Sequence, residues 1–227
     1  MKLALVTGGH RRVGAVIASH LEAAGWTVAR HGAREDIAAD LADRDAVEAL
    51  IPRVSDRYGA LPSLLVNNAS RFVWDDVGSV TADALDAHHA VNARAPVMLA
   101  LALHRAGGTG SIVNILDQRI RNPNADQLSY TLSKTALAGA TRTLAITLAP
   151  ALRVNAVAPG LTLPTADYTA AQLERLAAAM PLARLPEPED IADAVLFLAA
   201  ARALTGQTIF VDAGASLKSF DRDFVYL

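Results

Sequence analysis

The sequence has 227 residues, of which 52% are hydrophobic, and it carries a formal net charge of -2 at pH 7. A chain of this length can bury a sizeable core, and the lack of a long basic run argues against nucleic acid or an anionic membrane surface as a partner. It contains no cysteine, which excludes disulfides, thiolate catalysis and cysteine metal sites. The apolar run at the start stops at residues 7–9, too early for a signal peptide, and no segment is apolar for long enough to span a bilayer. We therefore expect a cytoplasmic protein.

Short apolar runs alternate with amphipathic stretches along the chain. In chain order we predict a strand at 3–6, a helix at 13–24, strands at 26–30 and 37–40, a helix at 43–58, a strand at 63–67, one or two helices across 81–104, a strand at 111–116, a helix at 126–148, a strand at 153–157, helices at 169–180 and 189–201, and a strand at 208–211. Only residues 31–36 separate the second and third strands, whereas a full crossover helix needs about 10–12 residues. That connection is predicted to be a bare loop, unless the third strand is misplaced.

Strand–helix alternation with nearly continuous apolar strands is typical of a parallel sheet covered on both faces. The pattern runs unbroken, without a linker, a repeat or a low-complexity segment. It predicts one doubly wound α/β domain of the Rossmann type over residues 1–227, with about seven parallel strands and helices on both faces. A substrate loop is expected at about 160–185.

A glycine-bearing turn, Thr7–Gly14, joins the first strand to the first helix. Glycines let the backbone approach a phosphate closely, and the helix N-terminus offers free N–H groups to it. Such a turn by itself is a weak signal, but its place after the first strand favours a dinucleotide site. Asp40 and Leu41 end the third predicted strand, where they are expected to meet the adenine edge.

Basic residues cluster where the second strand ends. Enzymes that bind NAD carry an acidic residue there, but this chain has Arg30, His31 and Arg34, with Arg11 and Arg12 nearby. Guanidinium groups pair bidentately with the oxygens of a 2′-phosphate. We therefore predict NADPH as the cofactor. The alternative, that these arginines form a solvated surface, stays open here.

Tyr130 and Lys134 lie four residues apart in a predicted helix and therefore on one face of it. A free tyrosine has a pKa near 10, and a neighbouring ammonium group would lower the pKa of the phenol. We thus predict that Tyr130 is a proton donor whose pKa is lowered by Lys134.

The motifs Thr7–Gly14, Asn67-Asn68-Ala69, Asn92, Tyr130/Lys134 and Ala158-Pro159-Gly160 follow the order and spacing of the short-chain dehydrogenase/reductase family, which the whole chain resembles. The resemblance implies hydride transfer from a nicotinamide and a homo-oligomer, either a dimer or a tetramer. It implies that Tyr130 is the catalytic acid, that Lys134 also binds the nicotinamide ribose, and that Asn92 holds a water in a proton relay. The cofactor residues that it and the motifs imply are Gly8, His10, Arg11, Arg12, Val13, His31, Arg34, Asp40, Leu41, Asn68, Ala69, Ser70, Ile115, Tyr130, Lys134, Pro159, Gly160 and Leu161.

Asp117 stands where most members of this family carry a serine that hydrogen-bonds a substrate carbonyl. A carboxylate would repel the negative charge that develops on a reduced ketone, whereas it suits a basic nitrogen heterocycle and a C=N bond. Pteridine reductases and bacterial dihydromonapterin reductases share this aspartate, and they are also similar to the chain at Arg12, Ser70 and Phe72. The resemblance implies that these residues, with Tyr130, contact a pterin-like substrate.

Several alternatives remain open at this point. Phe72 can be a core aromatic, and Asp117 can mark another carbonyl or imine substrate or a non-catalytic scaffold. Tyr168 is predicted to belong to the substrate lid and Trp74 to line its mouth, although both can be ordinary packing residues. No set of ligands for a metal accompanies the histidines, so we expect no metal site.

Overall fold

The computed structural model describes residues 2–32, 37–164 and 167–227. Its centre is a seven-stranded sheet in the order β3-β2-β1-β4-β5-β6-β7, and every strand pairs with its neighbours in parallel. The strands are β1 (Leu3–Thr7), β2 (Thr27–Gly32), β3 (Ile37–Ala38), β4 (Leu64–Asn67), β5 (Gly110–Ile115), β6 (Leu152–Pro159) and β7 (Thr208–Val211). The predicted fold class is confirmed. The third predicted strand is also in place, since His31 of β2 pairs with Ile37 of β3.

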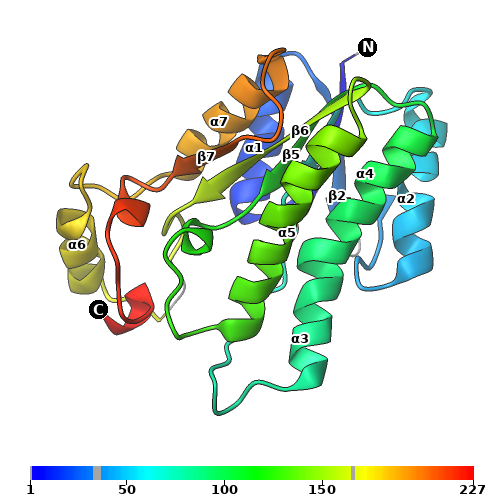
Figure 1. Cartoon of the computed structure of the whole chain (residues 1–227). Coiled ribbons are helices and arrows are strands. Elements are labelled where there is room, and N and C mark those ends of the chain that lie inside the picture. Colours follow the sequence, from blue (N-terminus) through cyan, green and yellow to red (C-terminus); the bar gives the residue numbers. More distant parts are fainter. Residues whose placement is uncertain (1, 33–36, 165–166) are drawn as a thin grey trace.

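Helices cover both faces of the sheet (Figure 1). The helices are α1 (Arg12–Ala23), α2 (Arg44–Tyr58), α3 (Ala82–His89), α4 (Ala95–Arg105), α5 (Leu128–Thr147), α6 (Ala170–Ala179) and α7 (Pro188–Ala200), and of these α6 lies to one side of the sheet, near the C-terminus. Alternate residues of each strand point to opposite faces, so Leu3 and Leu5 join the core under α2, α4 and α5, whereas Ala4 and Val6 join the core under α1 and α7. This explains why β1 is apolar at four successive positions, Leu3–Val6. No helix in the described ranges is long and apolar enough to cross a membrane.

The predicted helical stretch 81–104 forms two helices with a break beside the cavity. A π-helical turn, Ala90–Arg94, separates α3 from α4, and Asn92 lies inside it. Pro96 has no backbone N–H and so cannot donate to the carbonyl of Asn92 four residues earlier. The missing hydrogen bond favours a π-turn at this point, and such turns are frequent at functional sites.

The topology places a crevice at the carboxyl ends of the strands. From β1 the chain first builds outward through β2 and β3, and it then returns to the other side of β1 to build β4 to β7. In open parallel sheets ligands bind where the strand order reverses in this way. The loops that follow β1, β4, β5 and β6 all open on this side, and they carry most of the predicted site residues.

Candidate active site

A cavity of about 980 Å³ lies at this switch point, at the upper end of the 300–1,000 Å³ range of ligand pockets. The structure brings most of the predicted site residues to its walls. Those that line it are Gly8, His10, Arg11, Arg12, Val13, His31, Asp40, Leu41, Asn68, Ala69, Ser70, Phe72, Trp74, Ile115, Asp117, Tyr130, Lys134, Pro159, Gly160, Leu161 and Tyr168. Arg34 lies outside the described residues, and Asn92 does not line the cavity.

The nucleotide turn is held tightly against the end of β4. Thr7 Oγ1 accepts hydrogen bonds from the backbone N–H groups of Asn68 and Ala69, each at 3.0 Å, and Asn68 Nδ2 donates to the carbonyl of Thr7 at 2.9 Å. A Cβ on Gly14 would lie 2.1 Å from the carbonyl oxygen of Gly8 and 2.4 Å from Asn68 Nδ2. Only glycine fits there, so the start of α1 can pack directly against Gly8 and Asn68.

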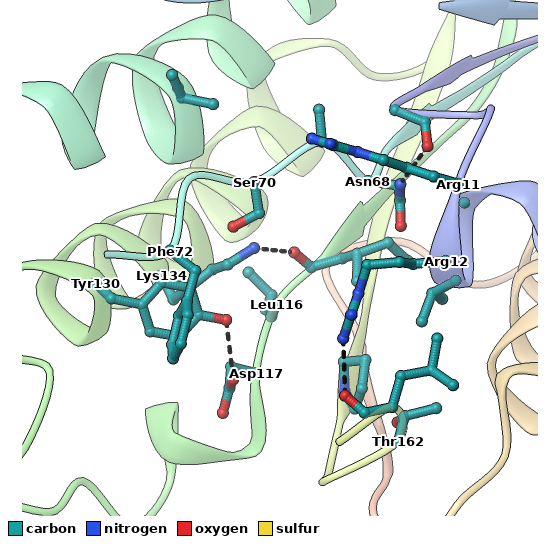
Figure 2. A pocket seen from close by; sticks show the side chains of 18 of the residues that line it. Arg11, Arg12, Asn68, Ser70, Phe72, Leu116, Asp117, Tyr130, Lys134 and Thr162 are labelled. Atoms are coloured by element: carbon teal, nitrogen blue, oxygen red, sulfur yellow. Dashed lines mark hydrogen bonds between the residues drawn. The ribbon is translucent and has the colours of Figure 1, made fainter. Parts of the chain in front are cut away.

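Arg12 occupies a position that favours glycine. Its φ is +51°, in the left-handed region that costs an L-residue roughly 1–2 kcal/mol. Its guanidinium group donates to the carbonyl of Leu163 at 2.8 Å, a contact drawn in Figure 2. Arg12 thus ties the nucleotide turn to the predicted substrate loop.

The basic cluster at the end of β2 is only partly turned toward the cavity. Arg30 pairs instead with Glu22 at 2.7 Å and donates to Ser19 Oγ at 3.0 Å, and it does not line the cavity. His31 is buried: its Nε2 lies 3.0 Å from the carbonyl of Ala39, and burial lowers its pKa. A neutral ring is the consequence. Arg11 is exposed at the rim of the cavity.

Tyr130 points at a carboxylate. Its hydroxyl donates to Asp117 Oδ2 at 2.9 Å, as Figure 2 shows. Burial raises the pKa of Tyr130 well above 10.0, the charge of Asp117 raises it further, and the charge of Arg119 lowers it. The expectation that the pKa of Tyr130 is lowered is therefore wrong for the protein by itself. The phenol is a neutral proton donor, not a phenolate.

Lys134 lies on the same face of α5, with its Nζ 5.7 Å from the centre of the Tyr130 ring. It donates to the carbonyl of Ile115 at 2.8 Å and is buried. Burial lowers the pKa of Lys134 to about 8, against the opposing effect of Asp117. Its ammonium group is held toward the strand end and not toward the phenol oxygen, which explains why it does not offset the burial of Tyr130.

Asn92 holds the loop after β4 against α5 through its side chain. Its Oδ1 accepts from the Arg71 backbone N–H at 2.7 Å and from Ser70 Oγ at 3.1 Å, and its Nδ2 donates to the carbonyl of Arg71 and to Ser133 Oγ, both at 2.9 Å. Both polar atoms of the side chain thus have protein partners. In this arrangement the side chain positions the loop after β4. Its amide group already makes two hydrogen bonds at each polar atom and so has none left for a relay water.

Aromatic side chains form one wall of the cavity. Phe72 meets the ring of Tyr130 edge to face, with ring centres 4.8 Å apart, and it is 49% exposed. It is therefore a wall residue and not a core residue. Trp74 also lines the cavity and contacts Tyr226 near the C-terminus, with ring centres 6.1 Å apart.

Sequence reasoning missed Arg119. This residue lines the cavity two positions after Asp117, and its side chain is only 8% exposed. Asp223, Phe224 and Val225 line the cavity as well. The signal that could have indicated Arg119 is its position two residues after Asp117, in the loop that follows β5.

Comparison with known proteins agrees with this architecture. A family model described as enoyl-(acyl carrier protein) reductase matches residues 7–216. The 3-oxoacyl-acyl-carrier-protein reductase FabG of Staphylococcus aureus is 33% identical over 250 residues, which cover 94% of this chain and 97% of its own.

Two crystal structures of FolM alternative dihydrofolate reductase 1 are similar to the chain, each in complex with NADP and each 40% identical. The one from Brucella suis has a TM-score of 0.89 and covers 97% of both chains, and the one from Brucella canis has a TM-score of 0.90 and covers 97% of this chain and 96% of its own. Together with the Tyr130–Lys134 pair in a switch-point cavity, these matches show that the chain belongs to the short-chain dehydrogenase/reductase family of oxidoreductases.

Proposed function

We propose that the protein is an NADPH-dependent reductase of a C=N bond in a dihydropterin or dihydrofolate. The observation that carries this proposal is the carboxylate of Asp117, which accepts a hydrogen bond from Tyr130 at 2.9 Å inside the cavity. A ketone-reducing site needs neutral donors at that point, whereas a carboxylate can accept from the N–H groups of a pterin. The two similar structures, of alternative dihydrofolate reductases in complex with NADP, support the assignment.

The residues at the switch point fit a dinucleotide. Gly8, Arg11, Arg12 and Gly14 border the cavity at the N-terminus of α1, where free backbone N–H groups suit a pyrophosphate. His31, Asp40 and Leu41 line the end that would hold the adenosine, and Arg11 stands at the rim where a 2′-phosphate would lie.

At the other end, the residues that would flank the nicotinamide are Ile115, Pro159, Gly160, Leu161, Tyr130 and Lys134. When bound, the reduced cofactor supplies the hydride.

Proton delivery falls to the residues of this chain. Reduction of C=N adds a hydride to carbon and a proton to nitrogen, and Tyr130 holds such a proton on its hydroxyl. Its raised pKa keeps that proton in place at neutral pH. Asp117 orients the hydroxyl and accepts from the heterocycle, while Phe72 covers the ring face. Arg12 and Ser70 border the same space, and Tyr168 closes it from the loop after β6.

Lys134 and Asn92 complete the proposed mechanism. The buried ammonium of Lys134 would bind the nicotinamide ribose and carry positive charge toward Tyr130. The side chain of Asn92 is used by Ser70, Arg71 and Ser133. A relay water at Asn92 would therefore bind its backbone carbonyl, to which Pro96 cannot donate.

A reductase of another carbonyl or imine compound is the second candidate. The observation in its favour is the 33% identity to a 3-oxoacyl reductase. The carboxylate of Asp117 disfavours ketone substrates, because it would repel the negative charge that develops on the ketone oxygen. A non-catalytic scaffold is the weakest alternative, because a scaffold has no need of Tyr130 and Lys134 buried together at a cavity.

The decisive assay follows the loss of NADPH absorbance with 7,8-dihydromonapterin or dihydrofolate as substrate. We expect turnover with NADPH, much slower turnover with NADH, and a smaller preference for NADPH in Arg11→Ala. A panel of ketones serves as the control. Tight binding of NADPH with turnover of ketones but of no pterin would refute the pterin assignment and leave the cofactor assignment standing.

A pH dependence follows from the buried lysine. The pKa of Lys134 is lowered to about 8, so the ammonium form is lost as pH rises through that value. We expect kcat/KM for NADPH to be constant at neutral pH and to fall above about pH 8, because kcat/KM reports the free enzyme. The pKa of Tyr130 lies well above 10.0 and contributes no limb there. The same alkaline limb in Lys134→Met would contradict this origin.

Assembly and location are part of the proposal. On α5, Ile146 is 82% exposed and Leu132 is 51% exposed, and both lie near one face of the helix, since they are separated by about four turns. We infer a homo-oligomer, a dimer or a tetramer, that acts in the cytoplasm. Sedimentation of wild type against Ile146→Glu tests the contact, and a monomeric wild type would refute it.

A further inference from the structure

The last eight residues return to the cavity. This C-terminal segment, residues 220–227, lies beside α6 in Figure 1. Gln172 of α6 donates to the carbonyls of Phe224 at 3.2 Å and Val225 at 2.7 Å. Arg222 pairs with Asp126, just before α5, at 2.9 Å. The segment is therefore fastened to two elements, and its residues 223–225 line the cavity.

Arg119 connects this segment to Asp117. Its backbone N–H donates to Asp117 Oδ1 at 2.9 Å, and its Nε lies 3.9 Å from the same oxygen. Its guanidinium carbon lies 6.0 Å from the centre of the Tyr130 ring. Asp117 thus has one oxygen on the phenol and the other on Arg119, and this second contact prevents the carboxylate, which is 23% exposed, from turning away.

Asp223 holds the far side of Arg119. Its carboxylate forms an ion pair with Arg119 Nη2, and the two side chains are 4% and 8% exposed. Asp223 is itself fixed, because its backbone N–H donates to Asp126 Oδ2 at 2.7 Å and its Oδ1 accepts from Val225 at 3.0 Å. Removal of one partner would leave an uncompensated charge inside the protein.

We propose that Arg119 and Asp223 are positioning residues of the active site: Asp223 fixes the guanidinium group of Arg119, and Arg119 holds the carboxylate of Asp117 against Tyr130 and the substrate. Asp223 is then a working part of the site, although it lies 104 positions from Arg119 in sequence. The inference deepens the proposed function and rests on it, because Asp117 is the residue that is positioned.

The first test compares Asp223→Asn with Asp221→Asn, the same chemical change at an exposed position two residues earlier. A misplaced reacting group costs up to about 100-fold in rate, so we expect Asp223→Asn to lower kcat for dihydropterin by about 10- to 100-fold. The KM and the Kd for NADPH should both stay near those of wild type, since Asp117 is not one of the residues proposed to hold the cofactor. Asp221→Asn should behave as wild type. An unchanged kcat in Asp223→Asn would overturn the proposal.

Three further variants separate positioning from folding. Replacing both buried charges, in Arg119→Met with Asp223→Leu, removes the ion pair without leaving a lone charge, and such replacements are often neutral for stability. We expect this double variant to fold, to bind NADPH and still to lose kcat. Arg119→Lys keeps the positive charge and should recover part of kcat relative to Arg119→Met. Wild-type kcat in the double variant would show that the pair is merely structural.

One readout needs no substrate. The backbone amide of residue 119 donates to Asp117 Oδ1, so its hydrogen exchange, followed by NMR in the NADPH complex, reports where the carboxylate lies. We expect faster exchange at this amide in Asp223→Asn but not in Asp221→Asn. If wild type reduced no dihydropterin and this difference were still seen, the proposed function would fail while the positioning pair would stand. Equal exchange in both variants would refute the pair itself.

Discussion

Tyr130→Phe is expected to lower kcat for dihydropterin by about 10²–10⁴-fold, the range that general acid catalysis contributes. The substitution removes only the hydroxyl that donates to Asp117 at 2.9 Å. The ring and its contact with Phe72, with ring centres 4.8 Å apart, remain. Binding of NADPH, measured by its fluorescence, should therefore be unchanged, and the loss should appear in single-turnover rates at saturating cofactor.

Tyr58→Phe is the matched control for this prediction. Tyr58 ends α2, packs against the core and does not line the cavity. The loss of its hydroxyl should therefore leave kcat within a small factor of wild type. If Tyr130→Phe kept the wild-type kcat, the proton would come from another group. Asp117 would then be the first candidate.

Asp117→Asn should have the second largest effect, a loss of about 100-fold or more in kcat/KM for dihydropterin. The amide has nearly the size of the carboxylate, so the fold is preserved, but it carries no charge and accepts fewer hydrogen bonds from the N–H groups of a pterin. Steady-state kinetics with dihydropterin and with ketones measures the change. Asp117→Ser, which introduces the residue usual in the family, should lose pterin turnover as well and is the variant in which ketone turnover is expected to increase.

The sign of a pH effect adds an independent check on Asp117. Its charge raises the pKa of both Tyr130 and Lys134. The asparagine removes that charge, so both pKa values should fall. The alkaline limb of kcat/KM for NADPH should then begin below the value of about 8 set by Lys134 in wild type. A limb that moved to higher pH, or an Asp117→Asn enzyme with full pterin turnover, would rule out the proposed role.

Much of the site could be predicted because it depends on local spacing. Tyr130 and Lys134 share a helix face at any placement of that helix, since the α-helical repeat makes residues i and i+4 neighbours. The strand–helix alternation likewise predicts a parallel sheet, and a parallel sheet gathers the loops after β1, β4, β5 and β6 at one edge. For this reason the predicted residues meet in one cavity.

Local spacing does not predict the orientation of a side chain. Arg30 stands at the predicted strand end, but Glu22 on α1 attracts it away from the cavity. Asn92 is near the site, yet the loop at Arg71 and Ser70 uses its side chain. In each case a partner from another element decides the orientation, because a hydrogen bond to a fixed group outweighs exposure to water for a partly buried polar atom.

The sequence by itself determined the sheet, the nucleotide turn, the Tyr130–Lys134 pair and the departure at Asp117, because each depends on residues near one another in the chain. Only the tertiary structure decided that Asp223 meets Arg119, and that burial raises the pKa of Tyr130 where the sequence predicted a lowered one. The path of the C-terminal segment and the degree of burial are properties of the packed molecule. Both depend on contacts between residues far apart in sequence, and no local pattern carries that information.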